Sequence, residues 1–471
     1  MIVIGGGLAG LSAAIALAES GCRVRLFEKR PFLGGRATSY VLPTGEHVDN
    51  CQHVTLGCCT NLDDFCRRVG AAGKVRFFDR LVFADPQGRL GAMAASWLPA
   101  PFHLALSFTF FPALDRYDKR AIGRAMMEMV RAGGHPHDLD EPGGITMLEW
   151  LRRRGQTPRA IERFWRVVLV SALDEELDRA DARYGVDVFF KAFLANRRGY
   201  RMGVPSVPLA ELYGGCRAAI EARGGEVHLR APVRGLVFNG HRLRGVQLDD
   251  EREETGDYCV LAVPHDAVRA LLPEEVAARE PVFAALDNLR VSPITGVHFW
   301  FDRVVLREPF LTLLDMTSQW VFNKSALYRR AAGDANSAAP GQYLQIVISA
   351  SYDLVEKPRQ EIIDLCLREL RQVLPAAREA QLVKATVIKE AAATFSPAPG
   401  CDRWRPAQKS PVAGLFLAGD WTATGWPATM ESAVRSGYLA AEAILAEGGS
   451  PRTFLQPDLP VGRLVRLLAR R

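Results

Sequence analysis

A glycine-rich turn near the start of the chain is the feature that most constrains its fold. Gly5, Gly7 and Gly10 fit the pattern G-x-G-x-x-G and follow a short apolar run, Met1 to Ile4. The alanine-rich segment from Leu8 to Ser20 predicts a helix after this turn. In such a unit the first glycine permits a tight turn, the second lets a pyrophosphate approach the backbone, and the third lets helix and strand pack closely.

A second predicted strand, Cys22 to Glu28, completes a βαβ unit of the Rossmann kind. Glu28 ends this strand, where an acidic residue binds a ribose hydroxyl rather than a 2′-phosphate. The backbone N–H groups of Leu8 and Ala9 begin the helix and face a bound anion. Lys29 is a further candidate contact to the dinucleotide. The alternative for both Glu28 and Lys29 is that they are solvated charges on the protein surface. In this context the motif predicts dinucleotide binding.

A second glycine-rich turn, GGRATS, follows within ten residues. Gly34 and Gly35 permit another close approach of the backbone, and Arg36 offers a fixed cation near a phosphate or a flavin. This turn favours FAD over NAD as the cofactor. A purely structural Gly-Gly-Arg turn is the alternative.

The two ends of the chain together resemble a known flavin-binding pattern. Ile2 to Ser39 and the stretch LAGDWTATGWPATMESAVRSG are similar to the two FAD signatures of the amine oxidase and phytoene desaturase superfamily. The resemblance implies that Asp420 binds the ribityl or phosphate part of FAD and that Gly419 allows its approach. It also implies a helix from about Met430 that points its N-terminus at the flavin. Further FAD contacts expected on this basis are Val233, Met430 and Glu431.

The fold implied is a mixed α/β fold of amine oxidase type, in which a Rossmann-like FAD-binding domain is interleaved with a substrate domain of antiparallel sheet and helices. Period-two patterns at Thr295 to Phe301 and at Tyr343 to Ala350 predict strands of that antiparallel sheet. The predicted segments are 1–90, 206–290 and 405–447 for the FAD-binding domain, 91–205 and 291–404 for the substrate domain, and 455–471 for a basic amphipathic tail.

A narrower likeness lies in VDNCQHVTLGCCTNL, residues Val48 to Leu62. This segment resembles the D-N-x-Q-H segment of hydroxysqualene dehydroxylases, a family of squalene and hopanoid biosynthesis. The resemblance implies that reduced FAD delivers hydride to an allylic carbon of hydroxysqualene while the hydroxyl leaves as water, giving squalene. Hydroxide is a poor leaving group, so an acid must protonate it, and His53 and Asp49 are the candidates. Structural roles, a hydrogen-bonded histidine and a turn-capping aspartate, are the alternatives.

Aromatic faces stabilise an incipient allylic cation, and Trp421 and Trp426 lie in the second FAD signature. Both are candidates for the substrate pocket, with packing in the core as the alternative. Two alternative functions remain open, an isoprenoid desaturase of carotenoid type and a flavin amine oxidase. These enzymes share the FAD motifs, and the motifs do not determine the direction of hydride transfer. A noncatalytic prenyl-lipid carrier needs no complete dinucleotide site and is disfavoured by the intact glycine set.

Composition excludes several other classes. The formal net charge is +6 over 471 residues and the arginines are spread along the chain, so no basic stripe indicates nucleic-acid binding. Nine irregularly spaced cysteines match neither a zinc site nor a secreted disulfide framework and fit a reducing cytosol. No signal peptide is expected before the first strand. The redox partner that reduces FAD is not identified.

Two segments indicate contact with a membrane surface, which an isoprenoid lipid substrate requires. The apolar window Trp97 to Leu114 is interrupted by prolines, so it predicts no membrane-spanning helix but either core or the lip of a substrate tunnel. In the tail, Val461, Leu464, Val465 and Leu468 are spaced as one helix face and Arg463, Arg466 and Arg470 as another. This helix either binds anionic lipid or docks on its own protein. We therefore expect a cytoplasmic protein attached peripherally to the inner face of the cytoplasmic membrane.

Overall fold

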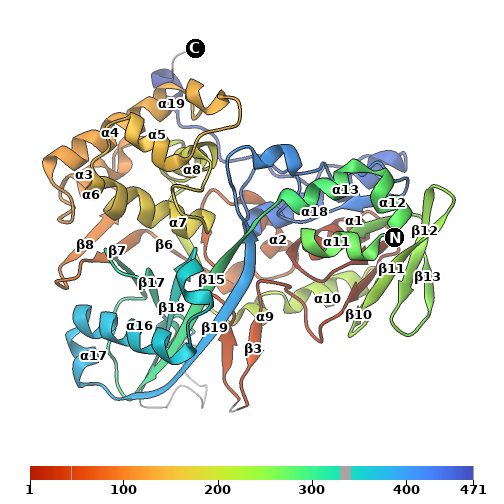
Figure 1. The fold of residues 1–471 in the computed structure, drawn as a ribbon, viewed down its shortest axis with the longest axis horizontal. Helices are drawn as coiled ribbons and strands as arrows, with labels where there is room; N and C mark the ends of the chain where they lie inside the picture. Colours follow the sequence, from red (N-terminus) through yellow and green to blue (C-terminus); the bar gives the residue numbers. More distant parts are fainter. Residues whose placement is uncertain (44, 329–340, 470–471) are drawn as a thin grey trace.

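The computed structural model describes residues 1–43, 45–328 and 341–469 and contains two large sheets, each with its own helices (Figure 1). A five-stranded parallel sheet carries the glycine-rich turns, in the order β10-β2-β1-β14-β20. Its strands β1, β14 and β20 are short and wholly buried, as expected for a parallel sheet with both faces covered. The strands are β1 (Ile2–Ile4), β2 (Arg25–Glu28), β10 (Glu226–Leu229), β14 (Cys259–Leu261) and β20 (Leu415–Leu417).

Two helices from opposite ends of the chain, α1 and α18, pack against each other beside the parallel sheet. Gly437 makes this possible, because a Cβ there would lie 2.1 Å from Ser12 Oγ. Ser12 Oγ instead donates a hydrogen bond to the carbonyl of Val434 at 3.2 Å. The helices of this part are α1 (Leu8–Glu19), α2 (Thr60–Arg68), α9 (Leu209–Leu212), α10 (Gly214–Glu221) and α18 (Met430–Glu447).

An antiparallel sheet in the order β11-β12-β13 lies beyond the edge of the parallel one, at the right of Figure 1. The strands of residues 224–250 therefore belong to two sheets: β10 joins the parallel sheet, and β11 and β12 lie in the antiparallel one. The elements here are β11 (Val233–Asn239), β12 (Arg242–Leu248), β13 (Glu253–Thr255), α11 (His265–Leu271), α12 (Glu274–Arg279) and α13 (Pro281–Ala285).

The second large sheet has seven strands in the order β19-β15-β18-β17-β16-β7-β8. All neighbours pair antiparallel except β16 and β7, and the period-two strands predicted at 295–301 and 343–350 are found as the pair β15–β18. Helices α16 and α17 cover one face with an apolar cluster of their own. The elements are β7 (Arg80–Ala84), β8 (Leu90–Ala94), β15 (Val291–Phe301), β16 (Phe310–Leu313), β17 (Trp320–Asn323), α14 (Lys324–Leu327), β18 (Gln342–Ser349), α15 (Tyr352–Val355), α16 (Arg359–Val373), α17 (Pro375–Glu379) and β19 (Leu382–Phe395).

The domain boundary predicted at residue 90 differs from this arrangement. β7 and β8 form a hairpin that joins the seven-stranded sheet through β16, so residues 80–94 lie with that sheet and not with the parallel one. The division into an FAD-binding and a substrate-binding domain stays a prediction.

Helices fill most of the segment 105–194, and they form the upper left of Figure 1. Two of them are π-helices, a type that is rare and often found at functional sites. They are α3 (Ala105–Thr109), α4 (Arg116–Arg131), α5 (Met147–Arg153), α6 (Pro158–Ala160), the π-helix η4 (Ile161–Arg166), α7 (Val167–Leu173), α8 (Ala182–Val188) and the π-helix η5 (Phe189–Leu194).

Short elements connect these parts. The strands β3 (Ser39–Val41) and β4 (His47–Asp49) form a ribbon, and β5 (Thr55–Leu56), β9 (Met202–Pro205) and β6 (Val75–Phe78) form a small sheet. Single turns of 3₁₀-helix are η1 (Ala72–Lys74), η2 (Phe102–Leu104), η3 (His137–Asp140), η6 (Leu286–Asn288) and η8 (Cys401–Trp404).

The tail forms a helix of six residues, α19 (Arg463–Leu468), that packs against α4. Val465 is fully buried in the main core, and Val461 and Leu468 pack partly against it. The apolar face of the tail therefore docks on its own protein, while Arg463 and Arg466 are exposed. Arg470 lies outside the described residues. Within those residues, no helix combines the length and the apolar composition needed to cross a bilayer.

Candidate functional site

The first glycine-rich turn leaves no room for side chains. Gly5 has φ 104°, and a Cβ there would lie 2.4 Å from the carbonyl oxygen of Ala262. A Cβ at Gly10 would lie 2.0 Å from the carbonyl oxygen of Gly5. Gly7 caps the N-terminus of α1 without a side-chain hydrogen bond, so Leu8 and the residues after it begin the helix with no side-chain cap. The N-terminus of α1 is thus built to receive an anion.

Glu28 stands at the carboxyl end of β2, beside this turn. Its Oε2 accepts a hydrogen bond from the backbone N–H of Gly6 at 2.6 Å, and its Oε1 accepts one from the N–H of Arg30 at 2.8 Å. The carboxylate is therefore buried and fixed next to the glycine turn, where a ribose hydroxyl is expected. Lys29 is exposed.

The second glycine-rich turn rests directly on the first. The N–H of Gly34 donates to the carbonyl of Gly6 at 2.8 Å, and a Cβ at Gly35 would lie 2.9 Å from the Cα of Gly7. Both Gly34 and Gly35 have positive φ, 111° and 62°. Two backbone turns without side chains therefore lie against each other.

Arg36 joins the two ends of the chain. Its Nη2 lies 2.5 Å from Oδ1 of Asp420, and its Nη1 donates to the carbonyl of Ala393 at 2.9 Å. Gly419 precedes Asp420 with φ 153°, and its N–H donates to Oγ of Ser436 in α18 at 2.8 Å. The structure thus brings the two predicted signatures together in one site.

The residues present fit FAD. A Cβ at Gly5, Gly10, Gly34 or Gly35 would fill the cradle that these glycines form, here called the glycine cradle. The N-terminus of α1 has no side-chain cap, and a fixed carboxylate ends β2. These groups would hold the pyrophosphate and the adenosine ribose, while Arg36 and Asp420 would hold the part of the cofactor nearer the flavin.

Three other predicted FAD contacts lie at element ends. Val233 begins β11 and Met430 begins α18, in contact with the hydroxyl of Tyr213 at 3.8 Å. Glu431 is buried, and its carboxylate accepts hydrogen bonds from the N–H groups of Asn61 (3.1 Å) and Leu62 (2.8 Å). Glu431 therefore caps α2, a contact between distant segments that the sequence pattern did not indicate.

Asp49 is the centre of a buried polar cluster. Its Oδ2 accepts from Lys324 Nζ at 2.7 Å and from the Tyr328 hydroxyl, and its Oδ1 accepts from Ser39 Oγ at 2.7 Å. Burial raises the pKa of Asp49, but the charge of Lys324 and these hydrogen bonds outweigh it and leave the pKa below its ordinary value. This environment favours a structural carboxylate over the proton donor that the sequence predicts. Lys324 is 275 positions away, and no pattern in the sequence pairs the two.

His53 is half-buried, with Nδ1 3.1 Å from the carbonyl oxygen of Cys51. Burial lowers the pKa of His53, and the bond to Cys51 only partly opposes this. The ring is therefore neutral at pH 7 and a weak proton donor.

The two candidate pocket tryptophans are packed away. Trp421 is buried and its Nε1 donates to the carbonyl of Val263 at 2.9 Å. Trp426 is buried in a small cluster with Cys58 and Ala192. Neither lines the apolar cavity described next, so both fit core packing better than substrate contact.

An apolar cavity of about 170 Å³ lies between the β7–β8 hairpin and the helices of segment 102–194. Both π-helices contribute to its wall, through Phe164 and Phe193 among others. Its two polar side chains are engaged elsewhere: Arg163 pairs with Asp315 at 2.5 Å, and Tyr200 donates to the carbonyl of Asp79 at 2.9 Å. The lining residues are Leu81, Phe83, Met93, Pro101, Phe102, Leu104, Ala105, Phe108, Phe111, Gly123, Met126, Met127, Val130, Arg163, Phe164, Val168, Phe189, Phe193, Leu194 and Tyr200.

Comparisons with known proteins agree with this geometry. The chain is 28% identical to zeta-carotene desaturase of Synechocystis sp., covering 94% of this chain and 96% of that protein. It is 27% identical to 15-cis-phytoene desaturase of Solanum lycopersicum, covering 95% and 78%.

Among solved structures, an oxidoreductase from Methanosarcina mazei matches with a TM-score of 0.72 at 17% identity, covering 94% and 99%. A redesigned putrescine oxidase matches with a TM-score of 0.72 at 18% identity, covering 95% and 98%. These structures show the same amine oxidase-like fold. The family model for flavin containing amine oxidoreductases matches residues 8–445. The chain is therefore a member of the flavin-containing amine oxidoreductase family and an FAD-dependent oxidoreductase.

Proposed function

We propose that this FAD-dependent oxidoreductase removes the hydroxyl group of hydroxysqualene reductively and so forms squalene. The observation that carries the substrate class is the apolar cavity, whose wall offers a hydrocarbon chain almost only aliphatic and aromatic side chains. Relatives named for carotene and phytoene desaturation also support an isoprenoid substrate. The reaction type rests on the resemblance of residues 48–62 to hydroxysqualene dehydroxylases.

The residues of the chain contribute positioning, exclusion of water and a proton. The glycine cradle, Glu28, Arg36 and Asp420 would hold the cofactor, which in its reduced form would supply hydride. The apolar wall binds the hydrocarbon and keeps water from the reacting carbon. An acid then has to protonate the departing hydroxyl.

A desaturase acting on an isoprenoid chain is the second candidate, because the curated relatives quoted above carry that name. A flavin amine oxidase is less well supported, because none of the residues that line the cavity carries a carboxylate to meet a cationic amine. A noncatalytic lipid carrier has no use for the intact glycine cradle.

An anaerobic single turnover tests the proposal. The bound flavin is reduced, hydroxysqualene is added in mild detergent, and flavin absorbance and lipid products are followed together. We expect reoxidation of the flavin with formation of one squalene per flavin. Flavin that stays reduced in the presence of hydroxysqualene, while oxidised enzyme is bleached by phytoene or by an amine, would overturn the proposal.

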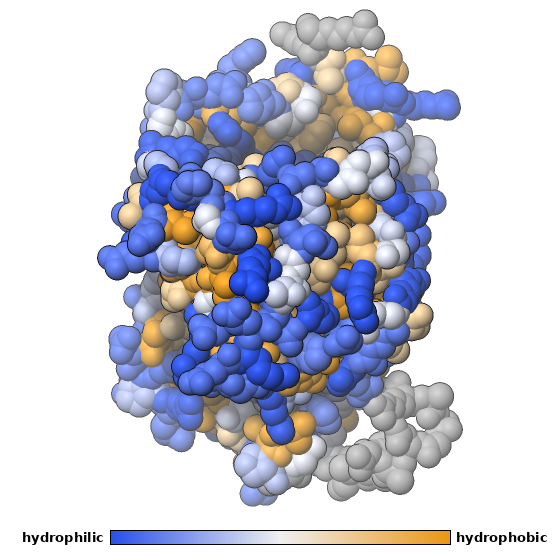
Figure 2. Space-filling model, turned by 90° about the vertical axis from the view of Figure 1, so that its right-hand side faces the viewer, coloured by the Kyte–Doolittle hydropathy of each residue, from blue (hydrophilic) through white to orange (hydrophobic). Residues whose placement is uncertain are grey.

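We also propose that the protein binds the cytoplasmic face of a membrane through segment 97–110. Trp97 is 79% exposed, Phe110 is 81% exposed and Leu106 is 46% exposed, although all three are apolar. Phe102 and Phe108 of the same segment line the cavity, so an exposed apolar surface lies at the wall of the substrate site. The opposite side of the molecule, seen in Figure 2, is covered mainly by hydrophilic side chains.

A further inference from the structure

We propose that Asp174 is the acid that protonates the departing hydroxyl of the substrate. The inference rests on the proposed dehydroxylation and assigns its proton donor. Asp174 follows the last residue of α7 and lies, 4% exposed, between the helices and the seven-stranded sheet.

The backbone at Asp174 is strained in a way that fixes the side chain. Its φ is 52°, in the left-handed region that residues other than glycine avoid. Its Oδ1 accepts a hydrogen bond from the N–H of Ala350 at 2.8 Å, and Ala350 itself has φ 50°. Two strained residues from α7 and the end of β18 therefore hold each other in place.

No cation neutralises this carboxyl group within residues 1–43, 45–328 and 341–469. Its Oδ2 accepts from the hydroxyl of Thr394 at 2.9 Å, a neutral partner. Burial raises the pKa of Asp174 well above its ordinary value, and the bonds from Ala350 and Thr394 only partly oppose this. Burial without a counter-ion therefore favours the protonated form of Asp174, whereas the charge of Lys324 favours the carboxylate of Asp49.

The adjacent Glu175 has a different environment. It is fully buried, but Arg179 lies 3.4 Å from its Oε1, and its Oε2 accepts from the hydroxyls of Tyr352 (2.8 Å) and Ser396 (2.5 Å). A cation and two donors suit a carboxylate.

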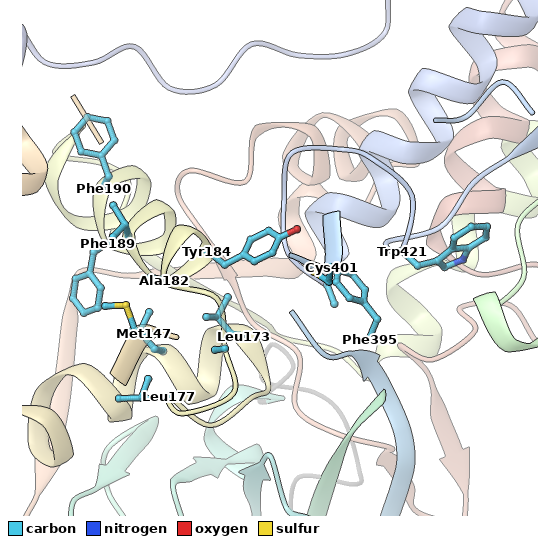
Figure 3. Close-up of a cluster of buried hydrophobic side chains, with 14 of the residues drawn as sticks. Met147, Leu173, Leu177, Ala182, Tyr184, Phe189, Phe190, Phe395, Cys401 and Trp421 are labelled. Carbon is cyan, nitrogen blue, oxygen red and sulfur yellow. The ribbon is translucent and has the colours of Figure 1, made fainter. Parts of the chain in front are cut away.

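The end of β19 places Asp174 beside the cofactor site. Each of the three consecutive residues 393–395 makes one contact there. The carbonyl of Ala393 accepts a hydrogen bond from Arg36, and the hydroxyl of Thr394 donates one to Asp174. The ring of Phe395 lies 4.8 Å from the guanidinium of Arg405. Arg405 in turn donates to the carbonyl of Asp420 at 3.0 Å. Figure 3 shows Phe395 at the tip of β19, between Leu173 of α7 and Trp421.

The same helix connects Asp174 to the substrate cavity. Val168 of α7 lines the cavity, and Asp174 lies six positions further along the chain, about 9 Å along the helix axis. Burial raises the pKa of Cys51, and among the neighbouring ionisable groups Asp174, in its charged form, would raise it most. Asp174 therefore lies near segment 48–53 and near the end of β19, which contacts Arg36 of the first FAD signature.

The proposed step balances in atoms and electrons. The C–O bond breaks with its electron pair on oxygen, the oxygen takes the proton of Asp174, and water leaves. The allylic carbon takes a hydride, and with it two electrons, from reduced FAD, which becomes oxidised. Asp174 is left as a carboxylate and recovers its proton from solvent. The product of the step is the hydrocarbon.

The protonation state is tested first, without cofactor or substrate. Infrared difference spectra at pH 7 compare wild-type protein with the Asp174→Asn variant, and we expect loss of the carbonyl band of one protonated carboxyl group. The Asp85→Asn variant is the control, because Asp85 is also a buried aspartate but pairs with Arg89 at 2.6 Å. If the Asp174→Asn variant shows the same carbonyl bands of protonated carboxyl groups as the wild type, the inference is overturned.

The catalytic role is tested by single turnover of two substrates, hydroxysqualene and its allylic chloride analogue, whose leaving group departs without a proton. For Asp174→Asn we expect the rate with the alcohol, per bound flavin, to fall at least about a hundredfold. We expect the ratio of alcohol to chloride rates to fall with it, because the chloride needs no acid. A purely structural role would lower both rates together and leave the ratio unchanged.

Poor folding of the variant does not spoil the comparison, since the ratio of two rates is independent of the amount of folded enzyme. The Asp174→Glu variant keeps an acid at this position and should retain more activity with the alcohol than Asp174→Asn. An Asp174→Asn enzyme that reduces the alcohol at the wild-type rate overturns the inference alone. Wild-type enzyme that forms no squalene overturns the proposed dehydroxylation instead.

Discussion

At the scale of single residues, Gly10 tolerates the least change in the cofactor site. A Cβ at this position would meet the carbonyl oxygen of Gly5 at 2.0 Å, and backbone atoms on both sides cannot move apart without opening the β1–α1 turn. We expect Gly10→Ala to lower the flavin content of purified protein at least about tenfold, measured by absorbance after gel filtration. Gly73→Ala is the control, because no atom lies within 4 Å of a Cβ there. Normal flavin content in Gly10→Ala would contradict the assigned cradle.

His298 predicts a pH dependence of stability. It is fully buried, its Nδ1 lies 2.8 Å from the Tyr343 hydroxyl, and burial lowers its pKa from 6.5 to about 3. As the pH falls from 6.5 towards 3, the unfolded chain binds a proton that the native protein does not. The free energy of unfolding should therefore fall by up to about 1.4 kcal/mol per pH unit over this range.

Chemical denaturation between pH 7 and pH 5 tests this prediction. The His298→Asn variant should show a shallower loss of stability on acidification than wild type. The control variant His137→Gln, at an exposed position, should keep the wild-type slope. If the free energy of unfolding falls equally steeply with pH in wild type and in His298→Asn, another group causes the loss of stability in acid.

At the scale of elements, Glu431 links the N-termini of α18 and α2. It is 1% exposed and also pairs with Arg435 at 2.7 Å. Removing the carboxylate leaves the N–H groups of Asn61 and Leu62 and the guanidinium of Arg435 without this partner. We expect Glu431→Ala to lower the free energy of unfolding by about 3–5 kcal/mol.

A comparison within the same helix controls for helix propensity. Glu447, at the other end of α18, pairs with Lys409 at 2.9 Å near the surface, and Glu447→Ala should cost less than about 1 kcal/mol. Flavin content measured on Glu431→Gln separates the capping role from a direct contact with FAD. Loss of flavin from a stable Glu431→Gln protein would favour the direct contact.

The elements also show what the sequence can predict. The β1–α1–β2 unit is found nearly where glycines and apolar runs predict it, because its contacts are local. The β7–β8 hairpin falls across the domain boundary predicted at residue 90, since its partner β16 lies over 200 positions away and no local pattern indicates that pairing. The partners of Asp49 and the burial of Asp174 depend on the same kind of distant contact. The FAD signatures were therefore predictable, and the polar groups around the reacting centre were not.

At the scale of the whole molecule, one side is expected to face a lipid bilayer. The double variant Trp97→Ser, Phe110→Ser removes two exposed apolar side chains from segment 97–110 without touching the core. We expect at least about a tenfold loss of co-sedimentation with anionic liposomes, because both side chains would be buried in the interface.

Two controls locate the membrane contact. Val383→Ser changes a side chain that is 65% exposed on β19, at the opposite edge of the seven-stranded sheet from β8, and should bind liposomes like wild type. A chain that ends before Val461 tests the docked tail, whose exposed arginines add attraction to anionic lipid. Unchanged binding by the double variant together with loss of binding by the shortened chain would assign the contact to the tail instead.

The ion pair between Arg36 and Asp420 has a consequence for synthesis of the protein. The edge strand β20 of the parallel sheet and helix α18, which packs on α1, are translated more than four hundred residues after β1. The nascent chain therefore carries the first half of the cofactor site long before the second half exists. Folding of this sheet has to wait for the end of translation, since domains close only when all their strands are available. Capture of FAD is then a late event, and ribosome-bound chains that stop before Asp420 should emerge without flavin.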